Sequence, residues 1–158
     1  MRFDFVAKLE KEMESNDSIF VLLGDLGFGI FDRIREKFPE RCINVGSSEQ
    51  LMLGMASGLA LGGKIPVCYS ISSFLIYRPF EFIRNYLDHE KIPVKLVGSG
   101  RDLDYGVAGF THHSTELKEI LALFVNIDSY WPNTKEEVNL IMDDFLYSNS
   151  PAFLSLKR

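Results

Sequence analysis

Short apolar runs alternate with helix-like segments along the whole chain. Six runs are expected to form strands, at residues 19–23, 43–45, 65–69, 94–97, 125–130 and 152–156. Helices are expected at residues 4–14, 31–38, 49–62, 79–90, 114–121 and 134–147. Continuous apolar runs of this length are typical of strands buried on both faces, which run parallel when helices connect them. The alternation predicts an α/β fold: residues 1–158 are expected to form one three-layer α/β/α domain with a mainly parallel sheet.

Composition narrows the classes of function. Hydrophobic residues make up 46% of the chain and charged residues 25%, ordinary values for a globular protein. The formal net charge of -5 argues against nucleic-acid binding, because phosphate contacts need clustered Lys and Arg side chains. No apolar run approaches the roughly 18 residues of a membrane span. Cys42 and Cys68 lie in apolar, strand-like segments, so buried free thiols and a reducing, cytoplasmic setting are expected.

The stretch from Ile43 to Met52 is predicted to be a short strand, a tight turn and the start of a helix that runs to about Gly62. Ser47 and Ser48 are candidate N-caps, and Glu49 lies in the first turn behind them. One apolar face of this helix has helical spacing and is expected to be buried; its residues are Met52, Met55, Ala56, Leu59 and Ala60.

Glycines recur on another face of the same helix, at Gly54, Gly58 and Gly62. An interior glycine costs a helix roughly 0.5–1 kcal/mol relative to alanine, so the repeat favours close approach of another backbone there. A helix packed on two sides is central to the molecule. We therefore expect Glu49 to lie deep in the molecule or in an interface, and it is the leading candidate for a catalytic residue.

Parallel sheets bind ligands at the carboxyl ends of their strands, and four notable residues lie in loops that follow predicted strands. They are Asp25, Glu49, Phe74 and His112. Taken singly, most of them have ordinary structural explanations, since aspartate is common in turns and Phe74 could be a core aromatic, as could Tyr77. His112 could be structural or simply exposed, and no residues at ligand spacing predict a metal site.

Two glycine patterns look like phosphate loops and are not. Gly58 to Lys64 fits G-x-x-x-x-G-K, but Ile65 replaces the required Ser or Thr, and the helix comes before the strand. Gly24 to Gly29 has its glycines in the wrong order for a dinucleotide fingerprint. There is no G-x-S-x-G nucleophile motif either.

Taken together, several segments resemble the pyrimidine-binding domain of transketolase and related thiamine diphosphate enzymes. They are Gly24–Gly27, Arg41–Gln50, Gly54–Pro66, Ser73–Arg84, Val94–Gly100 and Gly109–Glu116. Arg41–Gln50 is similar to the family's R-x-x-N-V-G-I-A-E-Q, and this block is highly specific. Gly109–Glu116 is similar to its G-P-T-H-H/Q-x-x-E. The resemblance covers nearly the whole chain in the same order.

The resemblance implies thiamine diphosphate as cofactor and gives Glu49 a role. In the family a glutamate protonates or hydrogen-bonds the aminopyrimidine ring, which then acts as the base that activates the thiazolium carbon. Glu49 matches that glutamate. Phe74 would stack on the aminopyrimidine, Tyr77 would line the same pocket, and Asp25 and Leu26 would lie near the thiazolium.

The resemblance also implies residues that contact substrate. His112 matches a histidine that contacts sugar substrates and is the second candidate catalytic residue. Arg158 falls near an arginine that binds substrate phosphate. Three positions depart from the family: Ala108 replaces an acidic residue used on a sugar hydroxyl, Phe110 replaces a proline, and Gly29 replaces a phosphate-binding serine. These departures affect substrate choice and leave the cofactor-activating residues unchanged.

The family holds the diphosphate and Mg2+ in a separate domain marked by G-D-G, and no G-D-G occurs in this chain. The resemblance therefore implies a stand-alone C-terminal-section subunit of a split transketolase-like enzyme. A partner subunit would supply the diphosphate and Mg2+ half, with a homodimer of this chain inside a heterotetramer. The expected reaction moves a two-carbon ketol unit between sugars, with sugar phosphates as the expected substrates.

Two alternatives remain open at this stage. One is a subunit of another split thiamine diphosphate enzyme of the 2-oxoacid decarboxylase or dehydrogenase type. The other is a non-catalytic paralogue that acts as a scaffold. Glu49, Phe74 and Tyr77 count against the scaffold, while Ala108 and Gly29 count somewhat for it.

Overall fold

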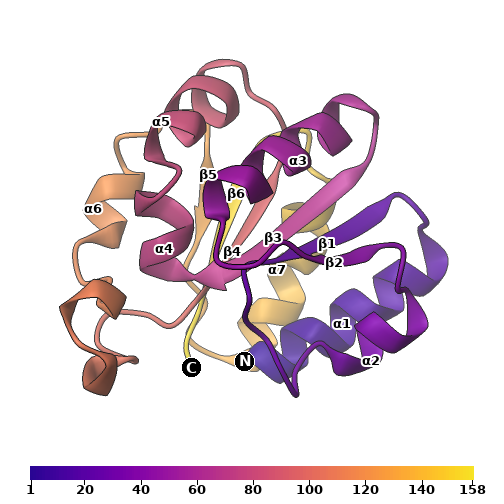
Figure 1. Ribbon diagram of the computed structural model, residues 1–158, viewed down its shortest axis with the longest axis horizontal. Helices are drawn as coiled ribbons and strands as arrows, with labels where there is room; N and C mark the ends of the chain where they lie inside the picture. The colour runs from indigo at the N-terminus through magenta and orange to yellow at the C-terminus, as the bar shows by residue number, and fades with distance from the viewer.

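Six strands form a single sheet in the computed structural model, which describes residues 1–158 (Figure 1). The strands are β1 (Ile19–Leu23), β2 (Cys42–Asn44), β3 (Ile65–Ile71), β4 (Lys95–Ser99), β5 (Asp128–Tyr130) and β6 (Ala152–Leu156). Their order is β2-β1-β3-β4-β6-β5, and every neighbouring pair is parallel. The carboxyl ends of all six strands therefore meet at one edge. The predicted α/β fold with a parallel sheet is confirmed.

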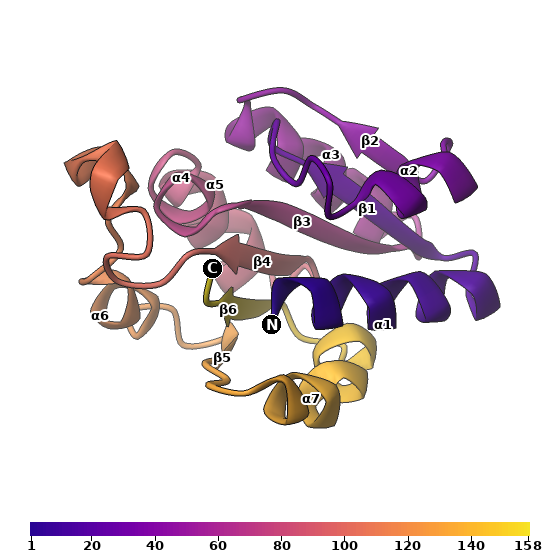
Figure 2. The same cartoon turned by 90° about the horizontal axis from the view of Figure 1, so that it is seen from below.

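Helices cover both faces of the sheet. One face carries α1 (Arg2–Ser15), α2 (Asp32–Lys37) and α7 (Lys135–Tyr147), and Figure 2 shows α1 and α7 beneath the strands. The other carries α3 (Glu49–Leu61), α4 (Ser72–Tyr77), α5 (Phe80–Phe82), the π-helix η1 (Ile83–His89) and α6 (Leu117–Leu121). A separate apolar core fills each side, and the two cores contain 20 and 17 buried residues. This is the predicted three-layer arrangement.

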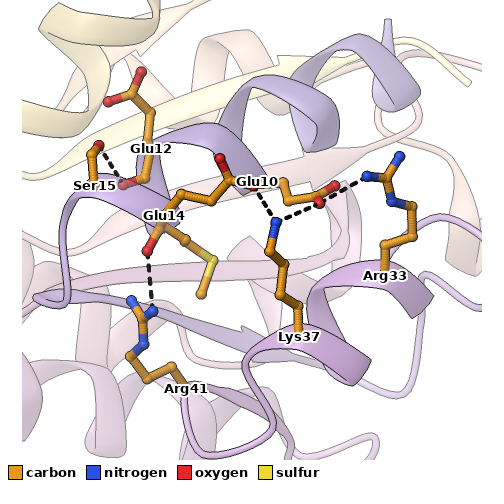
Figure 3. A network of polar contacts seen from close by, with 8 residues as sticks. Glu10, Glu12, Glu14, Ser15, Arg33, Lys37 and Arg41 are labelled. Carbon is orange, nitrogen blue, oxygen red and sulfur yellow. Dashed lines mark hydrogen bonds and ion pairs between the residues drawn. The ribbon is translucent and has the colours of Figure 1, made fainter.

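Ion pairs join α1 to α2 on the outside of the first core (Figure 3). The nearly buried Glu10 carboxylate accepts from Arg33 at 3.0 Å and from Lys37 at 3.5 Å, and Lys37 also pairs with Glu14. Arg41 donates to the carbonyl oxygen of Met13 at 3.0 Å, beside the end of α1. A cation there suits the negative end of the helix dipole. Arg41, which opens the specific sequence block, therefore has a structural role.

The segment before Pro79 corrects one prediction. The sequence predicts a helix that begins at Pro79 and places Phe74 in a loop, yet residues Ser72–Tyr77 already form α4, which carries Phe74. The chain continues from α4 through Arg78 in helical geometry to Pro79, which is the N-cap of α5. Proline is tolerated there because a residue at the start of a helix has no intrahelical partner for its N–H. Phe74 is thus held by a helix directly after β3.

Two further elements are shorter than predicted. The helix expected at 114–121 begins only at Leu117, because Ser114 forms an antiparallel bridge with Asp102. The strand expected at 125–130 is reduced to β5, because the Asn126 amide N–H donates to the Asp88 carboxylate at 2.8 Å and so does not join the sheet. The long loop expected after β4 contains two 3-10 turns, η2 (Gly106–Ala108) and η3 (Phe110–His112).

Two remaining observations concern the membrane and the thiols. None of the helices combines the length and apolar character needed to cross a bilayer. Cys42 and Cys68 are both buried free thiols, as predicted. Burial raises the pKa of Cys42 to about 11 and raises that of Cys68 further still.

Candidate functional site

Glu49 is a buried carboxylate at the first position of α3. Its residue is only 1% exposed, although it directly follows the exposed residues Ser47 and Ser48. Ser48 occupies the N-cap position but makes no side-chain capping bond, so the predicted serine cap is wrong in that respect. The apolar side of α3 packs into the core against β3, as the spacing of Met52 and Ala56 predicted. This packing fixes the start of the helix at the carboxyl edge of the sheet.

The two oxygens of Glu49 have different partners. The Ser70 hydroxyl, at the end of β3, donates to Oε1 at 2.8 Å. The Arg78 guanidinium donates to Oε2 at 2.6 Å. Gly24 lies beside the first contact, because a Cβ built there would be 2.9 Å from Ser70 Oγ and 3.4 Å from Glu49 Oε1. A side chain at Gly24 would disturb the hydroxyl that orients the carboxylate.

Arg78 connects the Phe74 ring to the Glu49 carboxylate. The centre of the Arg78 guanidinium lies 3.8 Å from the centroid of the Phe74 ring, within cation–π range. On η3, the His112 ring approaches Phe74 with a centroid distance of 4.8 Å and an edge-on geometry. The structure therefore brings three of the predicted residues, Glu49, Phe74 and His112, into one connected group.

Tyr77 faces a different partner. Its hydroxyl donates to Glu116 at 2.8 Å, and burial raises the pKa of this phenol, with the Glu116 carboxylate adding to the rise. One turn earlier, Ser73 donates to the carbonyl oxygen of Thr111 at 3.0 Å. Helix α4 thus holds both sides of the segment that carries His112, which lies beside it in Figure 1.

Asp25 and Leu26 lie in the turn after β1. Asp25 has a positive φ of 53°, and the Asn44 side chain holds it in place. Asn44 Oδ1 accepts from the Asp25 backbone N–H at 3.0 Å, while Asn44 Nδ2 donates to the Asp25 carboxylate at 3.2 Å. The same Oδ1 accepts from Gly46 N–H at 3.0 Å. The Leu26 side chain packs against the core on the α1 side of the sheet.

Arg158 joins the group at its outer margin. Its guanidinium lies 4.8 Å from the centroid of the Tyr105 ring, and that ring is 6.2 Å from the ring of His112. Its backbone N–H donates to the Asp104 carboxylate at 2.9 Å, and the same oxygen accepts from Arg101 N–H at 2.9 Å. The end of β6 and the His112 segment are therefore joined.

The three positions that depart from the family pattern are all exposed. Ala108 lies on η2, and Phe110 on η3 is 81% exposed. Gly29 has a positive φ of 75°, which a side chain would strain. Its N–H donates to both oxygens of Asp32 at 3.1 Å.

The glycine face of α3 is open. Nothing lies within 4 Å of a Cβ built at Gly54 or Gly58, so the expected close approach of a backbone does not occur within this chain. Leu51 and Leu61, 56% and 75% exposed, flank these two glycines along the helix. The prediction that α3 packs tightly on two sides is therefore wrong for the chain by itself, since only the opposite face enters the core.

Three residues that the sequence did not single out complete the site. Ser70 and Arg78 bind the two oxygens of Glu49, and Asn44 ties the Asp25 turn to the loop before α3. Asn44 stands inside the specific block around Glu49, which could have pointed to it. Arg78 lies inside the resembling segment Ser73–Arg84, but no sequence pattern connects Arg78 or Ser70 to Glu49, because only the folded chain brings them together. No group of three or more His, Cys, Asp or Glu side chains could hold a metal ion.

The residues present fit an aminopyrimidine. Arg78 presents a flat, delocalised group with N–H donors, which lies over the Phe74 face and donates to Glu49 Oε2. An aminopyrimidine is also flat and also carries hydrogen-bonding nitrogens. The space that the guanidinium fills between Glu49 and Phe74 therefore suits a ring of that kind in its place.

The fold and the site define an α/β domain with a parallel sheet and with a buried acid and an aromatic ring at the carboxyl edge of that sheet. The family comparison gives this class a specific identity: residues 3–158 match the model for "Transketolase, pyrimidine binding domain". The chain belongs to the transketolase family, as a pyrimidine-binding domain.

Two curated relatives are themselves named as transketolase subunits. It is 35% identical to an apulose-4-phosphate transketolase subunit of Actinobacillus succinogenes, over 77% of this chain and 39% of the relative. It is 28% identical to "6-deoxy-6-sulfo-D-fructose transketolase subunit SqwH" of Clostridium sp., over 100% of this chain and 49% of the relative. The chain thus spans half or less of the length of these relatives.

A solved structure agrees with both comparisons. It is named "Split gene transketolase, inactive beta4 tetramer", and it superposes with a TM-score of 0.87 at 26% sequence identity. The match covers 99% of this chain and 50% of that chain. The resemblance to the transketolase pyrimidine-binding domain that was drawn from the sequence is confirmed at the level of family and fold.

Proposed function

We propose that this chain is a subunit of a split transketolase-like enzyme that binds the aminopyrimidine of thiamine diphosphate. The observation that carries the proposal is the Glu49 carboxylate, 1% exposed at the start of α3, whose Oε2 accepts from the Arg78 guanidinium that lies over the Phe74 ring. When bound, the cofactor supplies the thiazolium carbon that carries the two-carbon unit.

Each of these residues would have a separate role in binding the cofactor. Ser70 holds Glu49 Oε1 and so orients the carboxyl group, which leaves Oε2 to hold a proton or accept a hydrogen bond at the pyrimidine ring. The Phe74 ring provides a flat apolar face for stacking. Glu49 lies in the low-dielectric interior, where such a hydrogen bond is electrostatically stronger than in water. Asp25, Leu26 and Tyr77 would line the outer parts of the cofactor site.

The substrate side would be formed by the segment after β4. His112 lies against Phe74 and would contact the sugar next to the cofactor. Arg158 would bind an anionic group at the far end of the substrate, and its backbone is tied to this segment through Asp104. The names of two relatives support a sugar substrate with an anionic group, because one names a sugar phosphate and the other a sulfo sugar.

The Mg2+ and diphosphate half of the site would come from a partner subunit. The relatives named as subunits and the split-gene structure support this arrangement. A second copy of this chain would cover the open glycine face of α3, since small residues allow close helix approach. The resulting assembly is a homodimer of this chain inside a heterotetramer, in which activity requires both kinds of subunit.

Reconstitution tests this proposal. The chain is mixed with its partner subunit, thiamine diphosphate and Mg2+, and ketol transfer is assayed with a panel of ketose and aldose phosphates. Glu49→Gln keeps the shape of the side chain, loses its acid–base capacity and is expected to lower kcat at least about 100-fold. Glu36→Gln, an exposed acid on α2, is the matched control. Undiminished turnover in Glu49→Gln would defeat the assignment.

A further inference from the structure

Arg78 contacts both of the groups that would bind the aminopyrimidine under the proposed function. Its guanidinium donates to Glu49 Oε2 at 2.6 Å and lies 3.8 Å from the centroid of the Phe74 ring. The aminopyrimidine would need the same carboxylate oxygen and an aromatic face in the same pocket. An arginine in this position and a bound ring exclude one another.

The remaining contacts of Arg78 allow it to leave. Its side chain is 43% exposed, whereas the Glu49 side chain is 1% exposed. Glu49 is the hydrogen-bond partner of its guanidinium, and the residue lies at the end of α4, where its backbone N–H makes a long 3.3 Å bond to Phe74. A half-exposed arginine on a flexible aliphatic stem can rotate into solvent without moving the sheet.

Charge explains why Arg78 enters the pocket. A carboxylate taken out of water is strongly unfavourable unless it is paired, and Ser70 supplies only one neutral hydrogen bond. Arg78 adds the charged partner and fills the space over Phe74 with a planar group. The buried acid is thereby kept paired in the cofactor-free chain.

We propose that Arg78 is a gate of the cofactor pocket, which closes on Glu49 and Phe74 when the cofactor is absent and swings out to admit the aminopyrimidine. The inference rests on the proposed function, because it assigns the pocket to that ring. It adds a competition: each binding event has to displace the guanidinium. If the gate is closed in about nine molecules of ten, the apparent affinity is about 10-fold weaker than that of the open pocket.

Equilibrium binding tests the gate directly. The full chain assembled with its partner subunit is titrated with thiamine diphosphate and Mg2+ in a calorimeter. Arg78→Met keeps an apolar stem over Phe74 and removes the charge, so its Kd is expected to be about 10-fold lower than that of the wild type. Arg78→Lys keeps the charge without the planar group and is expected to fall between the two. Arg84→Met, an exposed arginine on η1, is the charge-matched control and should bind like the wild type.

The outcomes separate the gate from the proposed function. Equal binding by wild type and Arg78→Met, with binding lost in Glu49→Ala, overturns the gate and leaves the proposed function intact. Weaker binding by Arg78→Met also overturns it, because Arg78 would then be a permanent partner of Glu49. Absence of binding in every variant counts against the gate and the proposed function together.

Thermal unfolding of the cofactor-free chain provides the second readout. Arg78→Met leaves a buried carboxylate without its charged partner and is expected to lower the Tm by about 2–5 °C. Adding Glu49→Gln in the same chain should recover most of that loss, because the uncompensated charge is gone. Additive losses in the double variant would show that the two side chains do not interact, and would overturn the gate.

Discussion

Two buried charges at the carboxyl edge of the sheet are satisfied in opposite ways. Arg101 is 9% exposed, and its guanidinium donates to Ser155 Oγ, Asn133 Oδ1 and the carbonyl oxygens of Pro132 and Ser155 at 2.8–3.1 Å. Glu49 is 1% exposed and has one hydroxyl and one half-exposed arginine. Both charges are hidden from water, and only Arg101 has a full set of fixed partners.

The difference separates a structural charge from one that can serve a ligand. Arg101, which follows β4, bonds to β6 and to the segment before α7. Loss of these bonds would remove the Arg101 donors from two carbonyl oxygens, which is costly for buried groups. Glu49 is held in place by Ser70, while its second oxygen is bound by a side chain that can move away. Burial alone therefore does not mark a functional charge; an incomplete set of fixed partners does.

The largest effect on stability is expected at Arg101. Arg101→Met removes four side-chain hydrogen bonds and leaves the Pro132 and Ser155 carbonyl oxygens without those donors. The free energy of unfolding should fall by about 3 kcal/mol, since a buried unpaired polar group costs about 1–3 kcal/mol. Urea denaturation measures it, with Arg84→Met as the control. A loss below about 1 kcal/mol would break the comparison.

A much smaller effect on stability is expected at Glu49. Glu49→Gln keeps the side-chain shape and an acceptor for the Ser70 hydroxyl and removes the buried charge, so the free energy of unfolding should change by less than about 1 kcal/mol. The same variant should lose activity in the assembled enzyme. A Glu49→Gln chain as unstable as Arg101→Met would make Glu49 a structural charge as well.

A mainly local effect is expected at Tyr77. Tyr77→Phe removes the 2.8 Å bond to Glu116 while keeping the ring, so α4 should hold the His112 segment less firmly. We expect amide hydrogen exchange to quicken in residues 110–116, with a global loss of about 0.5–1 kcal/mol. Tyr86→Phe, an exposed tyrosine on η1, is the control. Unchanged exchange in residues 110–116 would show that the bond does not hold this segment.

The smallest effect on stability at neutral pH is expected from the buried thiol of Cys42. Folded Cys42 has a pKa of about 11, above its ordinary value of 9.0, because burial disfavours the thiolate. The unfolded thiol therefore loses its proton first, so its contribution to stability is complete below pH 9 and is lost as the pH rises toward 11. Urea denaturation measured between pH 9 and 11 should show that the free energy of unfolding falls less steeply with pH in Cys42→Ala than in the wild type. An identical fall in both proteins would contradict the shifted thiol.

The order of strands and helices was predictable because it depends on local patterns. Apolar runs and helical spacing placed β1, β3, β4 and β6 to within about two residues, and the parallel sheet followed from their alternation with helices. Errors arose where a contact distant in sequence decides the local structure. The bridge from Ser114 to Asp102 delays α6, and Asp88 draws Asn126 away from β5.

The sequence by itself determined the class of fold, the family and the position of Glu49 at the start of a helix, since each of these depends on neighbouring residues or on a short specific motif. Only the tertiary structure decided which side chains meet that carboxylate. Ser70 and Arg78 lie 21 and 29 residues beyond Glu49 in the chain and reach it because β3 pairs in parallel with β1 and α4 follows directly. A contact of that kind depends on sheet register and helix packing, which no local pattern encodes.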